Sequence, residues 1–119
     1  MDSAEIEGRT LNAKDVREYA MRIALDQAQN AWLVGEVPVG AVIMRGGQVL
    51  ATGYNRPITT HDPTAHAEMV ALRQAAKAVG NYRLLDAALY VTIEPCVMCA
   101  GAMVQARIAR LIYGADDPK

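Results

Sequence analysis

Apolar residues recur at helical spacing through the first quarter of the chain. Between residues 13 and 32 they fall three or four positions apart, which is the period of an amphipathic α-helix. Asn12 precedes this stretch and is a favoured N-cap residue. We therefore expect a helix from about Ala13 to Trp32, with apolar positions at Val16, Tyr19, Ala20, Ile23 and Ala24.

The middle of the chain predicts a β-hairpin followed by a second helix. Two apolar runs, residues 40–45 and 48–54, flank Gly46-Gly47, and a pair of glycines between strands is typical of a tight turn. Asp62-Pro63 then has the composition of a helix start, because Asp is a common N-cap and Pro is favoured at the first helical position. We expect a helix with Pro63 at its first position, which continues as an Ala-rich stretch over residues 65–79 and is ended by Gly80.

The last third of the chain alternates strand and helix patterns again. Residues 88–93, apolar except for Thr92, are typical of a buried strand, Pro95 favours a helix through about Gln105, and residues 109–113 predict a final strand. Strands that alternate with helices indicate an α/β layered domain, in which at least the last two strands are parallel.

Composition and charge limit the class of protein only broadly. With 119 residues, 52% of them hydrophobic, and a net charge of −1, residues 1–119 are expected to form a single domain with its own core. No stretch approaches the roughly 20 apolar residues that span a bilayer, and the first residues lack the features of a signal peptide. We expect a cytoplasmic protein with no membrane partner. The near-neutral charge argues against a strongly basic nucleic-acid-binding surface but leaves room for a local one.

Four residues in two short motifs carry the clearest chemistry. His66, Cys96 and Cys99 are soft metal ligands, from His-Ala-Glu and Pro-Cys-Val-Met-Cys. A structural zinc site fills four positions with protein, whereas a hydrolytic site leaves one for water, so three ligands indicate a catalytic zinc. Glu68 is poorly placed to bind the same ion from a helix but well placed to move protons. This combination is the known signature of zinc-dependent base deaminases.

Both motifs fall at expected helix starts. Free backbone N–H groups and the helix dipole favour anions there. We therefore expect the pKa values of the Cys96 and Cys99 thiols to be lowered, so that both bind as thiolates. We expect Glu68 to be ionised until it accepts a proton.

Two other interpretations of these residues remain open. Cys-x-x-Cys is also a redox motif, although that motif usually follows the first strand of its fold. His61 and His66 together with the cysteines have a spacing allowed for a closed structural zinc site, which would make the chain a binding module. Against the closed site, Asp62-Pro63 interrupts the backbone between the histidines, and Glu68 would have no role.

The two motifs together resemble the cytidine deaminase superfamily. Further segments are similar to the bacterial tRNA-specific adenosine deaminases, and the likeness covers about Lys14 to Asp117. The segments are Glu36-Val-Pro-Val-Gly-Ala-Val, Tyr54-Asn-Arg-Pro, His61-Asp-Pro-Thr-Ala-His-Ala-Glu, Asn81-Tyr-Arg-Leu and Tyr113-Gly-Ala-Asp-Asp.

The resemblance implies a fold, an activity and a set of site residues. The fold is a cytidine deaminase-like three-layer α/β/α domain with a mixed central sheet, usually assembled as a homodimer. The activity is hydrolytic deamination of adenosine to inosine at the wobble position of a tRNA anticodon. Zinc falls to the three ligands and proton transfer to Glu68. Substrate binding falls to Asn55 through a hydrogen bond to the base, to Val39 as an apolar wall and to Ala67 through its backbone N–H.

The resemblance also implies one difference and leaves one alternative open. The family continues with a C-terminal helical segment that helps cover the sheet and contacts RNA, and we expect residues 1–119 to lack it. The alternative is a deaminase of free cytosine, guanine or a nucleotide. The zinc ligands cannot separate the two activities, because pocket shape and contacts to flanking nucleotides decide the substrate.

Overall fold

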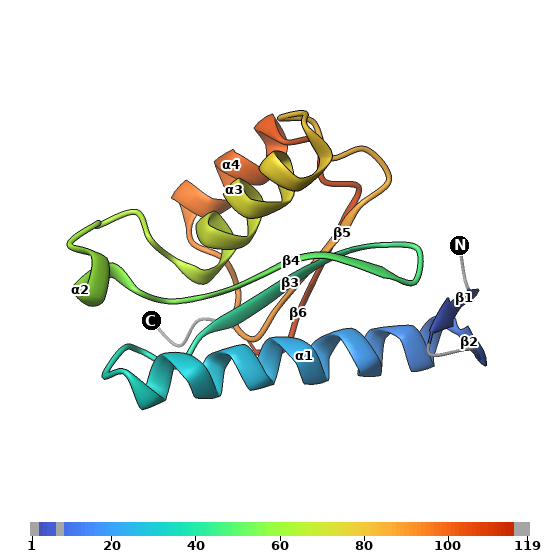
Figure 1. The fold of residues 1–119 in the computed structure, drawn as a ribbon, viewed down its shortest axis with the longest axis horizontal. Helices are drawn as coiled ribbons and strands as arrows, with labels where there is room; N and C mark the ends of the chain where they lie inside the picture. Colours follow the sequence, from blue (N-terminus) through green and yellow to red (C-terminus); the bar gives the residue numbers. More distant parts are fainter. Residues whose placement is uncertain (1–2, 7–8, 116–119) are drawn as a thin grey trace.

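The computed structural model describes residues 3–6 and 9–115. Within these residues, four strands form a mixed sheet in the order β4-β3-β5-β6 (Figure 1). β3 pairs antiparallel with both β4 and β5, whereas β5 and β6 are parallel. A separate two-stranded sheet, β1-β2, precedes them. The strands are β1 Ser3–Ile6, β2 Arg9–Asn12, β3 Gly40–Arg45, β4 Gln48–Tyr54, β5 Ala88–Val91 and β6 Arg110–Tyr113.

Helices cover both faces of the mixed sheet. The long helix α1 lies along one face, and α3 and α4 lie side by side on the other (Figure 1). The short helix α2 follows β4. The three-layer α/β/α arrangement with a mixed sheet is therefore confirmed. The helices are α1 Ala13–Leu33, α2 Pro57–Thr60, α3 Ala67–Val79 and α4 Val97–Gln105.

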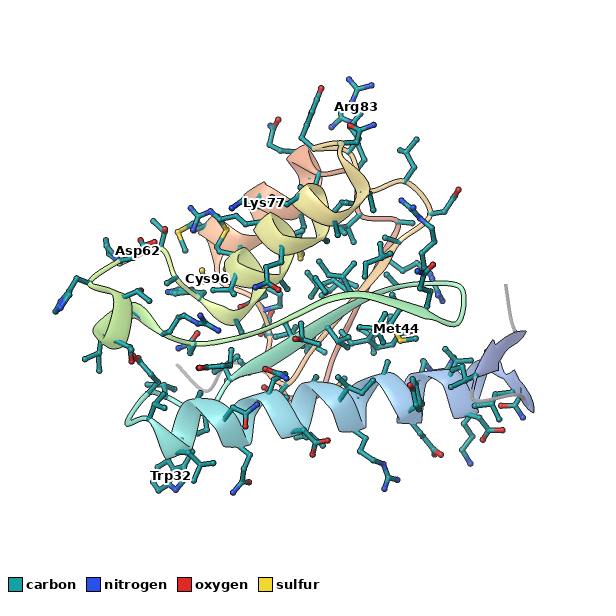
Figure 2. The ribbon with its side chains drawn as sticks, viewed as in Figure 1. Trp32, Met44, Asp62, Lys77, Arg83 and Cys96 are labelled. Atoms are coloured by element: carbon teal, nitrogen blue, oxygen red, sulfur yellow. The ribbon has the colours of Figure 1, made fainter. Side chains whose placement is uncertain are left out.

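β3 is the strand around which the core is built. Ala41 and Ile43 point into a cluster beneath α3 and α4, whereas Val42 and Met44 point into a second cluster beneath α1. Figure 2 shows Met44 between the sheet and α1, while Trp32 points outward from α1. A strand buried on both faces needs apolar side chains at every position, which explains the unbroken apolar run in this part of the sequence.

Several predicted boundaries agree with the structure. α1 begins at Ala13, and the Asn12 side chain caps it by accepting a hydrogen bond from the Asp15 N–H at 2.8 Å. The hairpin β3-β4 has the predicted limits, and Gly46 in its turn has a φ of 61°. The last two strands are parallel, as predicted. No helix in the described ranges is long and apolar enough to cross a membrane.

The predicted starts of α3 and α4, Pro63 and Pro95, were too early by four and two residues. α3 begins at Ala67, because the Asp62 carboxylate accepts hydrogen bonds from the N–H and hydroxyl of Thr64, at 2.9 and 2.7 Å. Asp62 therefore closes a local turn instead of capping the helix. α4 begins at Val97, after Pro95. His66 and Cys96, predicted within first turns, are instead the N-cap residues.

The strand and helix patterns missed three short elements and overextended two others. β1, β2 and α2 contain four residues each, too few for a hydrophobic period to show. β5 ends at Val91, two residues before the predicted limit, and β6 begins at Arg110.

Gly53 sets the distance between β4 and α3. A Cβ atom at this position would lie 2.5 Å from the Ala67 carbonyl oxygen and 2.8 Å from the Ala71 nitrogen. Both are backbone atoms, so they cannot move aside unless the helix moves. The glycine therefore allows the helix that begins at the site residues to pack directly on the sheet.

We predict that Gly53→Ala lowers the free energy of unfolding by about 1–3 kcal/mol or more, the usual cost of overpacking a core. Gly101→Ala is the matched control, because Gly101 lies in α4 and a Cβ there meets no atom within 4 Å. Alanine favours helix over glycine by about 1 kcal/mol, so the control should be as stable as wild type or more stable. Denaturant unfolding measures both, and equal stabilities would contradict the prediction.

Candidate functional site

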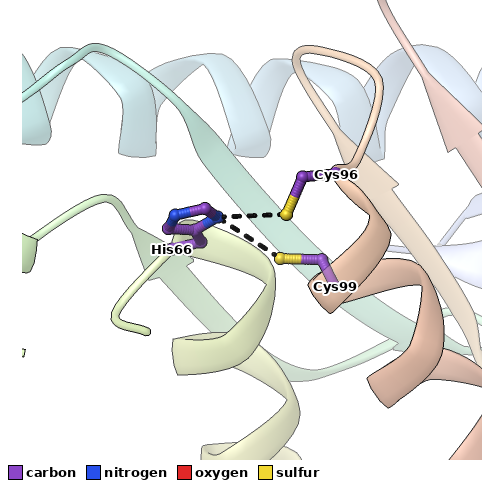
Figure 3. Close-up of side chains that lie close together, drawn as sticks. All are labelled: His66, Cys96 and Cys99. Atoms are coloured by element: carbon purple, nitrogen blue, oxygen red, sulfur yellow. Dashed lines mark hydrogen bonds between the residues drawn. The ribbon is translucent and has the colours of Figure 1, made fainter. Parts of the chain in front are cut away.

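Three residues from two helix starts meet at one point. His66 is the N-cap of α3, Cys96 is the N-cap of α4, and Cys99 lies in the first turn of α4. The Nδ1 atom of His66 lies 3.5 Å from the Cys96 sulfur and 3.6 Å from the Cys99 sulfur (Figure 3). The fold thus brings together ligands separated by 30 and 33 residues in sequence.

The spacing of these atoms fits a tetrahedral zinc ion. Standard zinc–nitrogen and zinc–sulfur bond lengths place neighbouring ligand atoms roughly 3.5–3.8 Å apart around such an ion. The two nitrogen–sulfur distances in the structure match this range, and all three ligand atoms lie within 4.8 Å of one another. One nitrogen and two sulfurs also form a donor set that zinc prefers.

His61 does not join this group. It is the exposed C-cap of α2, with a left-handed φ of 52°. Among the residues whose positions are described, the group that can hold a metal consists of His66, Cys96 and Cys99 alone. The closed four-ligand alternative is therefore not formed, and protein leaves one position of a four-coordinate ion unfilled.

Local structure leaves the two cap side chains available for a metal. His66 and Cys96 have extended backbone conformations, and neither side chain makes a capping hydrogen bond. The loop before His66 is fixed by other contacts. The His66 N–H donates to the Thr64 carbonyl at 2.8 Å, and Arg73 donates to the Thr64 hydroxyl at 3.3 Å. The Arg73 guanidinium also lies 3.6 Å from the Asp62 carboxylate.

Burial outweighs the helix starts in setting the ionisation of this site. Desolvation raises the pKa of the Cys99 thiol, and the nearby charges of Glu68 and Cys96 raise it further. Desolvation also raises the pKa of Glu68, although the Glu68 backbone N–H, His66 and Cys99 oppose this shift. The expectation that a helix start lowers the pKa of the Cys99 thiol was therefore wrong, and the pKa of Glu68 also lies above its ordinary value. Cys99 is completely buried and Glu68 is 3% exposed, so both lose the stabilisation that water gives to charge.

A cavity of about 230 Å³ lies beside the metal ligands. Glu68 lines it, so the acid predicted to move protons and the metal group share one space. Ile93 and Glu94 also line it, although the predicted site omitted them. Glu94 directly precedes the Pro-Cys motif, and this position was the signal that could have identified it. The lining consists of Val39, Asn55, His66, Glu68, Ile93, Glu94 and Cys96.

Two of the three predicted substrate-binding residues line this cavity, and the third, Ala67, lies outside the lining. Val39 and Asn55 line it, and the Ala67 N–H donates to the Asn55 Oδ1 atom at 3.0 Å. The Ala67 N–H is therefore engaged by Asn55 in this structure. Because the Asn55 Oδ1 atom accepts this bond, the NH₂ group of the Asn55 amide is left to donate hydrogen bonds into the cavity.

Residues 14–115 match the family model described as the cytidine and deoxycytidylate deaminase zinc-binding region. The chain is 48% identical over 120 residues to the tRNA-specific adenosine deaminase of Haemophilus influenzae. The alignment covers 100% of this chain and 66% of that relative. It spans 62% and 65% of two Buchnera aphidicola proteins of the same description. The chain therefore covers less than two thirds of the length of these curated relatives.

Two solved structures are similar in both sequence and shape. One comes from studies of A-to-I editing by tRNA:A34 deaminases at the wobble position of transfer RNA. It shows 50% identity and a TM-score of 0.83, covering 86% of this chain and 74% of that chain. The other is a guanine deaminase from Bacillus subtilis, with 40% identity and a TM-score of 0.75, covering 89% of this chain and 66% of that chain.

We predict one zinc ion per chain, lost in His66→Ala and retained in His61→Ala. Removing a residue that only hydrogen-bonds to a metal ligand lowers metal affinity about 10–100-fold. Removing the ligand itself should therefore lower zinc affinity at least as much. Because burial raises the Cys99 pKa, zinc must displace a proton from this thiol, and affinity should fall as pH falls. Elemental analysis and chelator competition between pH 6 and 8 measure these effects. Equal zinc loss in the two histidine variants would contradict the assignment.

Proposed function

Because the chain belongs to the cytidine and deoxycytidylate deaminase family, we propose that it hydrolyses adenosine to inosine at the wobble position of a tRNA anticodon. Its cofactor is zinc. The observation that carries the proposal is the shared cavity, in which a buried carboxylic acid lies beside a three-ligand metal group. The similarity to tRNA-specific adenosine deaminases supplies the substrate class. We place the activity in the cytoplasm, where tRNA is available and cysteines stay reduced.

In this proposal His66, Cys96 and Cys99 hold the zinc ion. When bound, zinc supplies Lewis acidity that lowers the pKa of water to near neutrality. The two cysteines would bind as thiolates, each releasing its proton, and their negative charge would offset the charge of the ion. Cys99 is buried and Cys96 is half-buried, so little water competes with the electrostatic interactions within the site.

Glu68 moves the protons that the reaction requires. Hydrolytic deamination adds water to the ring carbon and releases ammonia. A proton must therefore pass from the water to the ring nitrogen, and another must reach the departing amine. Burial raises the pKa of Glu68, so this carboxyl holds a proton more readily than an exposed glutamate and can still release it.

The other lining residues bind the base. Asn55 offers its amide N–H groups to acceptor atoms on the base, and Val39 and Ile93 contact its apolar faces. Ala67 lies outside the lining, and its backbone N–H holds Asn55 by donating to the Asn55 Oδ1 atom. A base inside a duplex cannot enter this cavity, whereas an anticodon loop presents an unpaired base at low energetic cost.

Free guanine is the competing substrate. The structural similarity to the guanine deaminase of Bacillus subtilis favours this second candidate. The same metal group and acid serve both reactions, so the zinc site does not distinguish them. Contacts to the nucleotides that flank the target distinguish them, because only an RNA substrate has such nucleotides.

We predict that the protein converts the wobble adenosine of a synthetic anticodon stem-loop to inosine. Free guanine and cytosine should be poor substrates. Nucleoside analysis by mass spectrometry measures inosine, and a stem-loop with its adenosine moved into the paired stem is the control RNA. Rapid turnover of free guanine with no change in the stem-loop would replace the RNA-editing proposal with the second candidate.

Glu68→Gln should lower turnover by on the order of a hundredfold or more, because it removes the group that transfers protons. The variant should keep one zinc ion, since Glu68 lies outside the ligand group. Glu18→Gln makes the same chemical change on an exposed position of α1 and is the matched control. If Glu68→Gln turns over as fast as this control, Glu68 has no part in proton transfer.

A homodimer is proposed through the outer face of α3 and α4. Val97 and Val104 lie seven residues apart on α4 and are 91% and 65% exposed. An apolar groove of about 320 Å³ is lined by residues of both α3 and α4, and large exposed apolar areas mark interaction surfaces. The groove is lined by Met69, Leu72, Arg73, Ala76, Tyr82, Ala102, Gln105 and Ala106.

We predict that light scattering at micromolar concentration gives the mass of a dimer. Val104→Glu should shift the protein toward monomer, because it buries a charge in the proposed interface. Leu25→Glu is the matched control, because Leu25 is 56% exposed on α1, which covers the opposite face of the sheet. A monomer in wild type, or equal dissociation in both variants, would exclude this interface.

A further inference from the structure

Glu36 is a buried acid that the proposed chemistry does not use. In the described part of the chain, Glu36 and Glu68 are the two buried charged residues, with 4% and 3% exposure. Glu36 lies in the loop between α1 and β3, outside the lining of the catalytic cavity. A buried carboxylate is costly unless hydrogen bonds compensate it, so its partners indicate its role.

The partners of Glu36 all lie in the first turn of α2. Its two carboxylate oxygens accept hydrogen bonds from the Ile58 N–H at 3.3 Å and from the N–H and hydroxyl of Thr59, each at 2.6 Å. Burial opposes ionisation of Glu36, but these hydrogen bonds outweigh it and lower the pKa. Arg56, the N-cap of α2, makes no capping bond with its own side chain. Glu36 therefore caps this helix from a distant part of the sequence.

Glu36 is itself fixed to the scaffold. Its backbone N–H donates to the Ala31 carbonyl at 2.9 Å, at the end of α1. Three residues later, the carbonyl of Val39 accepts from the Asn55 N–H at 3.1 Å. The loop that begins at Glu36 thus holds the segment after β4 at two points, one at the backbone of Asn55 and one at the start of α2.

This segment leads directly into the site. Asn55 lies at its start and lines the cavity, and His66 lies at its end. The Arg56 N–H donates to the Ala65 carbonyl at 3.0 Å, so the start and end of the segment are joined. A shift of α2 would therefore move Asn55 relative to the N-terminus of α3. The hydrogen bond from the Ala67 N–H to the Asn55 Oδ1 atom depends directly on the distance between Asn55 and the N-terminus of α3.

We propose that Glu36 is a positioning residue, which holds Asn55 in register with the N-terminus of α3 by anchoring α2. The inference rests on the proposed function for its effect on catalysis, because Asn55 is the residue proposed to bind the base. The claim that Glu36 holds Asn55 in place does not depend on the substrate.

Amide hydrogen exchange in the zinc-loaded protein tests the structural part. In Glu36→Gln the carboxylate is lost but the side-chain size is kept. The amides of Ile58 and Thr59 should exchange faster, and the Ala67 amide should exchange faster by on the order of tenfold, because its acceptor on Asn55 moves. Arg45→Met is the matched control, since it removes a tertiary hydrogen bond, from Arg45 Nε to the Leu85 carbonyl at 3.0 Å, outside the cavity lining. It should leave the Ala67 amide protected.

A double-mutant cycle with Asn55→Ala tests the catalytic part. Glu36→Gln should lower kcat/KM on the anticodon stem-loop by on the order of tenfold, because small misplacements of a binding group are costly. In the Asn55→Ala background the same change should have almost no further effect, since both act through one contact. Zinc content should stay at one per chain. Thr59→Val removes only the hydroxyl donor from an exposed residue, and should show a smaller effect in the same direction if Glu36→Gln does not fold.

The outcomes separate the two proposals. If Ile58 and Thr59 lose protection while Ala67 keeps it, or if the effects of Glu36→Gln and Asn55→Ala multiply, Glu36 does not position Asn55. If the wild type leaves the stem-loop unchanged, the proposed function fails. Exchange at Ala67 then still decides whether Glu36 holds Asn55 in place.

Discussion

The site depends on the close approach of two helix N-termini on one face of the sheet. α3 begins beside Gly53 of β4, where the absence of a Cβ lets the helix backbone pack directly against the strand. α4 begins after β5 and packs beside α3 (Figure 1). Only with both helices at these distances do the His66 nitrogen and the two cysteine sulfurs reach the spacing of ligands around one metal ion.

Burial gives this meeting point its chemical character. The helix starts alone would favour anions, but Cys99 and Glu68 are enclosed by the core, and their pKa values rise instead. A divalent cation reverses the balance for a thiol, because its charge replaces the solvation that water no longer provides. Glu68 lies outside the ligand group, so burial raises its pKa while the charge of a bound cation acts in the opposite direction. The same lack of water thus favours metal binding by Cys99 and proton transfer by Glu68.

Local patterns in the sequence predicted much of the fold and the central chemistry. The helical period and Asn12 located α1, the paired glycines located the β3-β4 hairpin, and the two motifs identified the metal ligands that the structure brings together. The matched family and the TM-score of 0.83 confirm the cytidine deaminase-like fold. The starts of α3 and α4 and the direction of the Cys99 pKa shift were wrong, because a local turn and complete burial decided them. The Glu36 anchor could not be predicted, because Thr59 lies 23 residues away in sequence.

The position of the metal ligands also bears on how the chain holds together. His66 and Cys96 are 30 residues apart, and the segment between them contains α3 and β5. An ion held by both residues closes this segment into a loop. If the ion stays bound when the chain unfolds, the loop reduces the conformational entropy of the unfolded chain, as a covalent cross-link does. An ion that binds only the folded chain shifts the equilibrium by mass action instead. In either case the folded fraction of this protein becomes a function of the free zinc concentration around it.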